Sequence, residues 1–401
     1  MKFRSLFKAS PSKFGRGVPL LWRGISLSIL NGFFVRIFSI RRDNKQHKRT
    51  NIFLFESARS AIYNCLLSQG IGRGDEVIIS SFTCAAVPYA VMRAGATVVY
   101  VDINDDLSMR EEDVLAAIGL STKAVIVQNT FGKLGLNHVA IDELRSKDIF
   151  IIEDCALAIG SKVNEAELGS YGDMSVWTLE TSKTVTIGWG GVVSVNKTDC
   201  AGTLARRYAE LGQVSTLSDI RRIFQLWFSL VMMKLKIPGS NFIWYFMYGT
   251  KFFRRSNNFC EQHPLKYEKI GKISSLLFSY MMPKLSEMFY ATNRNCKYLQ
   301  EVADKLGLEH PVSELEGEYV VSPRFSLRVD QRYIDDIVRH GEKIGVEVGR
   351  WFTECPPRWR IEDAKIYSSS NAEMFSKQII NFPCHWTLTQ DELFSVKELM
   401  E

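Results

Sequence analysis

The 401-residue sequence lacks the cysteine and histidine patterns that mark metal sites and redox centres. Its eight cysteines are scattered and include no Cys-x-x-Cys pair, so neither a zinc site nor a redox dithiol is indicated. The six histidines are also dispersed, and we expect His385 to be structural rather than a ligand. Scattered cysteines are typical of a reducing cytosol, so we predict a cytoplasmic protein without a bound metal.

Acidic residues are almost missing from two segments of the chain. Residues 1–50 contain 12 Lys and Arg against one acid, and residues 221–255 contain seven against none. When these charges of +11 and +7 are subtracted from the total of +6, the rest of the chain carries −12. Both segments are also apolar, and the second contains ten aromatic residues. Such stretches favour helices at an anionic membrane surface, so we predict peripheral association with the inner face of the membrane.

Neither basic segment offers an uncharged run of the roughly 18 residues that a membrane-spanning helix needs. Arg23 and Arg36 interrupt the first segment, and Lys234 and Lys236 interrupt the second. The uncharged residues 24–35 are followed by arginines rather than by a signal-peptide cleavage site. The alternative for the first segment is a disordered tail. The alternatives for the second segment are a dimer contact and a cover over the active site. Nucleic acid is not expected as a partner, because no recognition module accompanies the charge.

Short apolar runs alternate with helix-like stretches between residues 51 and 200. Residues 77–80, 97–101, 123–127 and 149–152 are rich in Val and Ile, as is typical of strands in a mainly parallel sheet. Ligands of such sheets bind beyond the C-terminal ends of the strands, where Asp154 follows the fourth run. We therefore predict an α/β fold with helices on both faces of the sheet.

The domain boundaries follow from changes in composition along the chain. We predict a basic N-terminal segment at 1–50, a large domain at 51–213 and a basic, aromatic insertion at 214–262. Residues 263–401 would supply further helices and a small C-terminal α+β domain, with residues 323–330 as one strand. No tandem repeat or low-complexity tract interrupts this organisation.

Lys183 lies in the glycine-rich turn Ser-Lys-Thr-Val-Thr-Ile-Gly-Trp-Gly-Gly, 29 positions after Asp154. A lysine and an aspartate in such places are the two groups that pyridoxal phosphate requires. The lysine would bind the cofactor aldehyde and then move protons as a base. The aspartate would keep the pyridine nitrogen protonated. Alone, each residue is more often a solvated charge or a helix cap, so the surrounding sequence decides.

Seven blocks around these residues occur in an order that resembles the DegT/StrS-type family of pyridoxal-phosphate sugar aminotransferases. The blocks are residues 70–79, 81–90, 93–102, 127–132, 152–156, 169–173 and the Lys183 turn. Residues 381–392 are similar to the family's C-terminal Pro-x-His-x-x-Leu-Thr signature. The resemblance covers most of the chain after residue 50 and implies the type I aminotransferase fold, with Lys183 as the catalytic residue.

The resemblance also implies further contacts to the cofactor. Thr178 would donate its hydroxyl to the phosphate, and Ser182 lies close enough in sequence to help. Backbone N–H groups at a helix start near Ala58 and Arg59 would bind the phosphate through their geometry and dipole. Cys84 stands where many members place an aromatic ring. The predicted cofactor-binding residues are Asp154, Thr178, Ser182, Ala58, Arg59, Cys84 and Lys183.

Two further positions depart from the family's pattern. Leu157 stands where Gln or His usually approaches the ring hydroxyl of the cofactor, and its side chain forms no hydrogen bond. Trp189 replaces a polar or charged residue between the glycines of the Lys183 turn.

The resemblance implies transfer of an amino group, with glutamate as the expected donor, onto a nucleotide-linked keto-sugar. Such a reaction would serve the synthesis of surface polysaccharide or lipopolysaccharide, in a homodimer whose subunits share each site. Leu157 and Trp189 motivate an alternative, a non-catalytic, membrane-docked member with a binding or regulatory role. The presence of Lys183 and Asp154 argues against it. A sugar dehydratase is disfavoured because histidine replaces the lysine in those relatives.

Overall fold

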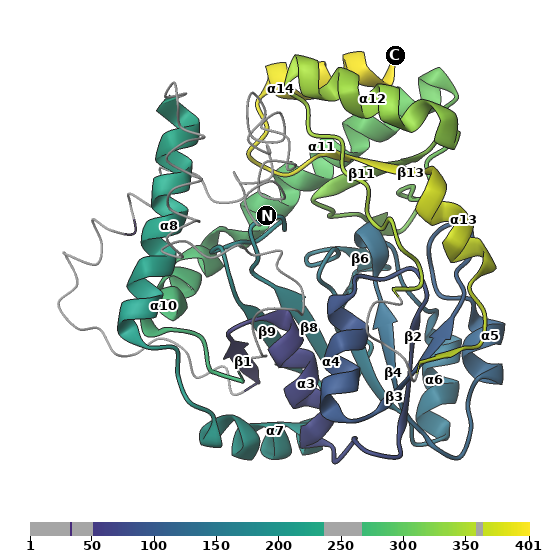
Figure 1. Cartoon of the computed structure of the whole chain (residues 1–401), viewed down its shortest axis with the longest axis vertical. Helices are drawn as coiled ribbons and strands as arrows, with labels where there is room; N and C mark the ends of the chain where they lie inside the picture. The colour runs from purple at the N-terminus through teal and green to yellow at the C-terminus, as the bar shows by residue number, and fades with distance from the viewer. Residues whose placement is uncertain (1–32, 34–50, 236–266, 358–363) are drawn as a thin grey trace, which may run out of the picture.

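The computed structural model describes residue 33 and residues 51–235, 267–357 and 364–401 (Figure 1). An eight-stranded sheet lies at its centre in the order β1-β9-β8-β5-β4-β2-β3-β12. Its strands are β1 (Ile52–Phe55), β2 (Glu76–Ser80), β3 (Thr97–Val101), β4 (Thr122–Gln128), β5 (Phe150–Asp154), β8 (Met174–Thr178), β9 (Gly191–Val195) and β12 (Lys365–Ile366). Strands β3, β2, β4, β5 and β8 pair in parallel, whereas β9 pairs antiparallel with both of its neighbours, β8 and β1. The predicted α/β class and the four predicted strands are confirmed.

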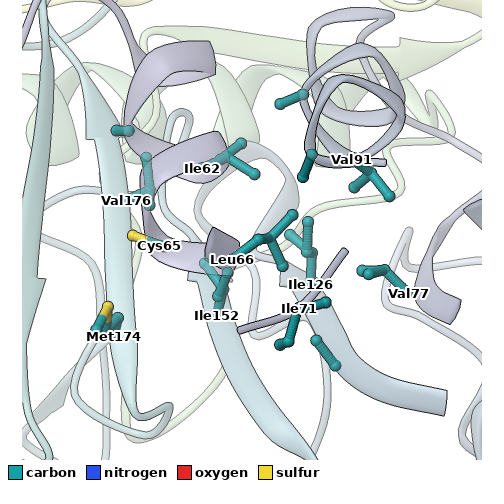
Figure 2. Packing of buried hydrophobic residues seen from close by; sticks show 14 of the residues in the cluster. Ile62, Cys65, Leu66, Ile71, Val77, Val91, Ile126, Ile152, Met174 and Val176 are labelled. Carbon is teal, nitrogen blue, oxygen red and sulfur yellow. The ribbon is translucent and has the colours of Figure 1, made fainter. Parts of the chain in front are cut away.

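Helices cover both faces of this sheet because its parallel strands are apolar on both sides. The helices around it are α3 (Ala58–Ser68), α4 (Ala86–Ala94), α5 (Glu111–Ala116), α6 (His138–Ser146) and α7 (Thr198–Glu210). Ile62 and Leu66 of α3 and Val91 of α4 pack on one face, over Ile126 and Ile152 (Figure 2). Helices α5 and α6 pack on the opposite face through a second, largely aliphatic cluster.

The C-terminal part of the chain has a core of its own. Its elements are α11 (Leu285–Leu306), β11 (Arg324–Arg328), α12 (Gln331–Ile344), α13 (Ser370–Gln378), β13 (Ile379–Pro383) and α14 (Gln390–Met400). Strands β11 and β13 pair antiparallel, and Phe325 and Phe382 pack with Leu299, Ile334 and Val396 of the helices. The strand predicted at 323–330 is confirmed as β11. Three two-residue strands, β6 (Lys162–Val163), β7 (Ala166–Glu167) and β10 (Glu318–Tyr319), form a further small sheet.

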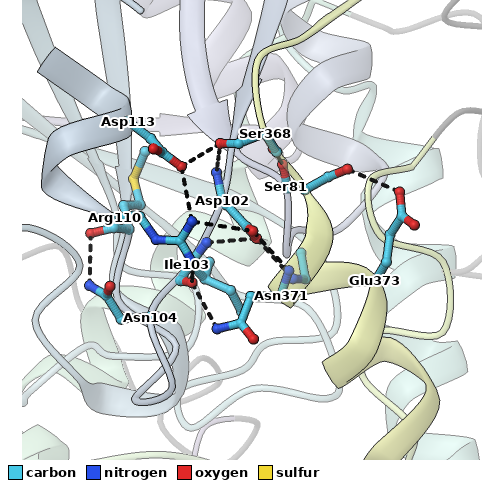
Figure 3. Close-up of polar contacts among 12 residues, drawn as sticks. Ser81, Asp102, Ile103, Asn104, Arg110, Asp113, Ser368, Asn371 and Glu373 are labelled. Atoms are coloured by element: carbon cyan, nitrogen blue, oxygen red, sulfur yellow. Dashed lines mark hydrogen bonds and ion pairs between the residues drawn. The ribbon is translucent and has the colours of Figure 1, made fainter. Parts of the chain in front are cut away.

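Polar contacts join this C-terminal part to the edge of the large sheet (Figure 3). Asp102, which follows β3, accepts hydrogen bonds from the backbone N–H groups of Asn371 and Ala372, at 2.8 and 2.9 Å. These are first-turn donors of α13, so the carboxylate satisfies groups that have no partner within the helix. Ser81 donates to the Ser368 carbonyl at 2.7 Å, and the short strand β12 adds to β3 in parallel.

Helix α8 (Thr216–Leu235) begins the predicted insertion and packs against α10 (Lys272–Met281). The side chain of Phe33 is 3% exposed and lies in the same apolar cluster, with its ring 5.9 Å from that of Tyr280. Most of the segment at 1–50, and residues 236–262 of the insertion, lie outside the described residues. No helix in the described part of the chain combines the length and apolarity that crossing a membrane requires.

Candidate active site

The sheet brings the predicted lysine turn and Asp154 to one edge. Asp154 ends β5 and pairs with Val176 in the parallel neighbour β8, two residues before Thr178 ends that strand. The chain then forms the turn that carries Lys183 and returns as β9, with Gly191 opposite Thr178. Backbone bonds between Leu179 and Gly190 (2.9 Å) and between Ile187 and Leu179 (3.1 Å) close this turn.

Lys183 is a half-buried amine among charged and aromatic groups. Its Nζ lies 4.4 Å from the ring centre of Trp351. Burial lowers the pKa of Lys183, while the nearby Glu180, Cys84 and Asp154 act in the opposite direction. A lowered pKa increases the fraction of neutral amine near pH 7, which is the form that attacks a carbonyl and accepts a proton.

Asp154 is 7% exposed and has little local hydrogen bonding for a buried carboxylate. Its Oδ1 accepts one bond from the backbone N–H of Ala156, at 2.9 Å. Burial raises the pKa of Asp154, and the Ala156 N–H and the charge of Lys183 only partly offset this effect. A cation placed beside the carboxylate would remove the penalty, and a protonated ring nitrogen is such a cation.

The start of helix α3 meets the sheet at Gly191, the first residue of β9. A β-carbon on Gly191 would lie 2.5 Å from the Ala58 nitrogen, so only glycine allows this close approach. Ser57 caps the helix by accepting from the N–H of Ser60 at 3.2 Å. The N–H groups of Ala58 and Arg59 belong to the first turn, where backbone donors have no partner within the helix. Their geometry suits a phosphate.

The hydroxyl groups of Thr178 and Ser182 are both engaged within the turn. Thr178 donates to the Gly190 carbonyl at 3.2 Å and accepts from the Glu180 N–H at 3.3 Å. Ser182 donates its hydroxyl and its N–H to the carboxylate of Glu180, the latter at 3.2 Å. The Ser182 hydroxyl is therefore hydrogen-bonded to a charged carboxylate. The Thr178 hydroxyl forms only longer hydrogen bonds to neutral backbone groups. This difference favours Thr178 as the phosphate ligand of the two.

Cys84 lies between β2 and α4 and is electrostatically close to the other predicted residues. Burial raises the pKa of its thiol, Lys183 and Arg59 lower it, and Asp154 raises it. These interactions place Cys84 among the charged groups at this edge of the sheet. Its side chain is too small to act as an aromatic platform, and the aromatic ring that lies over Lys183 is that of Trp351.

The two departures from the family's pattern both have packing roles. Leu157 is buried in an apolar cluster with Phe82 and Phe131, and the partly buried Trp351 packs against this cluster. Trp189 packs beside the apolar cluster that contains Trp177. Neither residue displaces Lys183 or Asp154 from the sheet edge.

Three residues near Lys183 were not predicted from the sequence. Glu180 lies in the same turn, and its spacing of three residues from Lys183 was a usable signal. Trp351 and Arg324 stand on distant segments, and the guanidinium of Arg324 lies 4.2 Å from the same Trp351 ring. No spacing in the sequence connects these two residues with Lys183.

Other parts of the structure offer different kinds of site. A cavity of about 1200 Å³ opens beside the start of α11, and Trp177, Asn196, Phe289 and Lys297 are among its lining residues. None of the predicted site residues lines it. Across the described ranges, no group of three or more His, Cys, Asp and Glu side chains could hold a metal ion. His385 is buried, and its Nδ1 lies 2.8 Å from the Thr387 hydroxyl.

The residues present at the sheet edge fit a pyridoxal phosphate cofactor. Asp154 supplies a buried carboxylate for the ring nitrogen, and Lys183 supplies the amine. The α3 start and Thr178 supply donors for the phosphate. This donor set is complementary to the charge at each end of the cofactor.

Comparison with known proteins finds sequence similarity over part of the chain. Residues 44–232 match the sequence model of the DegT/DnrJ/EryC1/StrS aminotransferase family. GDP-perosamine synthase of Escherichia coli O157:H7 is 36% identical over 137 residues, which cover 34% of this chain and 38% of that protein. UDP-N-acetyl-3-dehydro-alpha-D-glucosamine 3-aminotransferase of Acidithiobacillus ferrooxidans is 39% identical over 140 residues, again covering 34% and 38%. The matches thus span less than half the length of these relatives.

The fold is similar over a longer stretch. A DegT/DnrJ/EryC1/StrS aminotransferase from Brucella abortus superposes with a TM-score of 0.67 at 17% identity, covering 99% of this chain and 94% of that one. At this level of identity the likeness concerns the fold alone. It confirms the predicted aminotransferase fold, including the C-terminal part that the sequence matches do not reach.

Proposed function

Because residues 44–232 match the sequence model of the DegT/DnrJ/EryC1/StrS aminotransferase family, we propose that the chain is a pyridoxal-phosphate-dependent aminotransferase. The observation that carries this proposal is the meeting of the Lys183 amine and the buried Asp154 carboxylate at one edge of the sheet. When bound, pyridoxal phosphate supplies an aldehyde and an electron-withdrawing ring. The protein's residues bind, orient and exchange protons around it.

Each residue has a role that follows from its surroundings. Lys183, whose pKa is lowered by burial, holds or accepts the proton that leaves the amine-bearing carbon of the substrate. Asp154 holds the ring nitrogen in its protonated form, because a buried carboxylate strongly favours a positive neighbour. The first turn of α3, with Ala58 and Arg59, and the Thr178 hydroxyl hold the phosphate. Glu180 raises the pKa of Lys183 and positions Ser182.

For the substrates, the support comes from the names of the relatives. One matched protein is a GDP-perosamine synthase, and another is a 3-aminotransferase acting on a UDP-linked dehydro-glucosamine. We infer that this chain uses a nucleotide-linked keto-sugar as the amino acceptor and an amino acid as the amino donor. Glutamate is the expected donor. A role in surface polysaccharide or lipopolysaccharide synthesis follows from that acceptor class.

The non-catalytic alternative is less well supported than catalysis. It was motivated by Leu157 and Trp189, and both residues pack in apolar clusters without displacing the charged groups of the site. A chain that had lost catalysis would have no reason to keep a desolvated lysine near a buried aspartate, because both ions are expensive to remove from water.

The test is an absorbance spectrum of the purified protein with pyridoxal phosphate, followed by borohydride reduction and peptide mass mapping. We expect a reduced cofactor adduct on Lys183, and none in Lys183→Ala, which should otherwise fold normally. A panel of nucleotide-linked keto-sugars, added after the protein has been converted with glutamate, then identifies the acceptor. Folded protein that forms no adduct with excess cofactor would overturn the proposal.

A homodimer and contact with an anionic membrane surface belong to the same proposal. The dimer rests on the resemblance to the family, and light scattering after gel filtration tests it. Membrane contact rests on the net charge of +7 in residues 221–255 and +11 in residues 1–50. We expect the protein to sediment with liposomes containing anionic lipid at low salt and to be released as salt rises. Failure to bind at low salt would refute membrane contact.

A further inference from the structure

Cys296 and Cys384 form a pair of buried thiols in the core of the C-terminal part of the chain. Cys296 lies on α11 and Cys384 directly follows β13, so the fold brings together two cysteines that are 88 positions apart. Their Sγ atoms lie 3.3 Å apart, and both thiols are free. Both sulfur atoms also contact the backbone carbonyl of Ser322, at 3.5 and 3.0 Å. An approach of little more than about 1 Å would bring them to the length of a disulfide bond, about 2.05 Å.

A small cavity leads to Cys296. Its volume is about 10 Å³, close to the roughly 10–15 Å³ that one water molecule requires, and Cys296 lines it whereas Cys384 does not. Lys297 and Glu314 line both this cavity and the larger one of about 1200 Å³ beside α11. The two cavities are therefore neighbours, and the Lys297 side chain between them is 52% exposed. This route suits an oxidant little larger than water and excludes a bulky disulfide.

The two thiols have different roles in their mutual contact. Burial raises the pKa of Cys384, the hydrogen bond with Cys296 raises it further, and the charge of Arg324 offsets only part of the increase. Cys384 therefore keeps its proton and acts as the donor to the Cys296 sulfur. A hydrogen bond donated to that sulfur stabilises the Cys296 thiolate, which is the form that attacks an oxidant.

We propose that Cys296 and Cys384 are a site of reversible thiol oxidation, at which hydrogen peroxide joins α11 to the end of β13 through a disulfide bond. The Cys296 sulfur attacks one peroxide oxygen and the O–O bond breaks, which leaves a sulfenic acid and releases one water. Cys384 then attacks that sulfur, and its proton leaves with the hydroxyl group as a second water. Two thiols are thus oxidised and one peroxide is reduced. The inference does not depend on the proposed aminotransferase function.

The cross-link would reach the candidate active site through β13. Asn381 of this strand accepts from the N–H of Trp351 at 2.7 Å, and the Lys183 Nζ lies 4.4 Å from the centre of the Trp351 ring. Cys384 is three positions after Asn381, so a bond there ties the strand that supports Trp351 to α11. Disulfides that form transiently in a reducing cytosol are usually catalytic or redox-sensing, which agrees with the predicted cytoplasmic location.

The competing explanation is that the two cysteines only fill the core. Cys65 and Cys200 provide the comparison within the same molecule, because both are buried in the large domain. The Cys200 thiol donates to the side-chain oxygen of Gln69 instead, at 3.7 Å. A packing role predicts that peroxide leaves all four thiols reduced or oxidises them at similar rates. A built oxidation site predicts selective loss of Cys296 and Cys384.

The experiment exposes the purified, folded chain to hydrogen peroxide, alkylates the remaining thiols under denaturing conditions and maps the peptides by mass spectrometry. We expect linked peptides that contain Cys296 and Cys384, about 2 Da lighter than their sum, and reversal by dithiothreitol. These two thiols should disappear at least about tenfold faster than those of Cys65 and Cys200. Oxidised glutathione should form the cross-link at least about tenfold more slowly than peroxide, because it is too large for the cavity.

Three variants separate the two steps and control for folding. Cys384→Ser should stop the reaction at the Cys296 sulfenic acid, which dimedone traps as an adduct of defined mass. Cys296→Ser should give neither the cross-link nor the adduct and should leave Cys384 reduced. Cys65→Ser is the matched control, since it removes a buried thiol elsewhere and should keep the cross-link. Thermal unfolding before oxidation shows that each variant is folded.

The outcomes distinguish an oxidation site from core packing. Folded wild-type protein that forms no cross-link with peroxide would overturn the proposal, and so would equal oxidation of Cys296, Cys384, Cys65 and Cys200. A dimedone adduct at Cys384 in Cys296→Ser would overturn Cys296 as the attacking thiol. A cross-link in protein that has not been loaded with pyridoxal phosphate supports the proposal whether or not Lys183 forms an adduct.

Discussion

Two buried aspartates follow strands at the same edge of the sheet, and their surroundings differ. Asp102, after β3, is 1% exposed and accepts from the backbone N–H groups of Ile103, Asn371 and Ala372, with Arg110 3.7 Å away. Asp154, at the end of β5, accepts from Ala156 and has Lys183 nearby. The carboxylate of Asp102 already accepts hydrogen bonds from several donors within the fold. The carboxylate of Asp154 retains capacity for a ligand, and that difference distinguishes a structural acid from a functional one.

Asp219 shows that the first arrangement recurs in the molecule. Its carboxylate is 1% exposed and accepts from the N–H groups of Ile273 and Ser274, at 2.7 and 3.2 Å, in the first turn of α10. A buried acid with a helix start around it is thus a structural device of this fold. Asp154 has no helix start of that kind in the described part of the chain.

The largest expected effect tests Asp154 as the functional member of the pair. Asp154→Asn should lower the rate of amino transfer by about 10²- to 10⁴-fold, since breaking a buried charge pair costs about 3–5 kcal/mol and each 1.36 kcal/mol is tenfold in rate. Rates of cofactor conversion with saturating glutamate measure it, with Asp102→Asn as the control that should keep its activity. A loss smaller than about threefold would mean that Asp154 does not hold the ring nitrogen.

A second change tests Asp102 as the structural member. Asp102→Asn should lower the free energy of unfolding by about 2–3 kcal/mol, because the charged acceptor of several backbone donors is replaced by a neutral one. Urea unfolding of the cofactor-free protein measures the loss, and Asp154→Asn in the same assay should show none. Equal destabilisation by both substitutions would abolish the distinction between the two acids.

The pH dependence of stability sharpens the same contrast. Burial raises the pKa of Asp154 in the folded protein above its ordinary value of 3.8, so the ionised side chain destabilises the cofactor-free fold at neutral pH. The penalty is relieved as pH falls through the folded pKa and is gone below 3.8. Asp154→Asn should therefore melt above the wild type at about pH 7, and the gap should narrow as the pH is lowered towards 3.8. A gap that stays constant would contradict the raised pKa.

The smallest effect extends the contrast from acids to hydroxyls. Thr178→Ala should weaken cofactor binding about tenfold, the worth of one hydrogen bond to a charged phosphate. Ser182→Ala should weaken it less than about threefold, because that hydroxyl already donates to Glu180. Titrations that follow protein fluorescence give both affinities. A larger effect at Ser182 than at Thr178 would reverse the assignment.

The strands and the lysine turn could be predicted because their causes are local. Val- and Ile-rich runs indicate buried parallel strands, and glycines around Lys183 indicate a tight turn. The position of Asp154 beyond a strand end followed from the general geometry of such sheets. For these elements the sequence neighbours of a residue determine its environment.

The Arg324 and Trp351 part of the site could not be predicted, because its cause is tertiary. Arg324 reaches the Trp351 ring through the space left at Gly349, which is set by pairing with Asn381. None of these positions forms a motif with Lys183. The engagement of Ser182 with Glu180 was missed for a different reason, since a hydroxyl near a phosphate site and one bonded to an acid look alike in sequence.

The short strand β12 determines how the protein can be divided for experiments. It pairs with β3 through Lys365 and Ile366 and lies at the edge of the large sheet. A truncated chain that stopped before residue 364 would leave β3, whose sequence is Thr-Val-Val-Tyr-Val, as an open apolar edge. Exposed edges of this kind recruit strands from other molecules and promote aggregation. The C-terminal residues thus cover an edge of the large sheet that would otherwise be exposed. The two parts of the chain should therefore be expressed together.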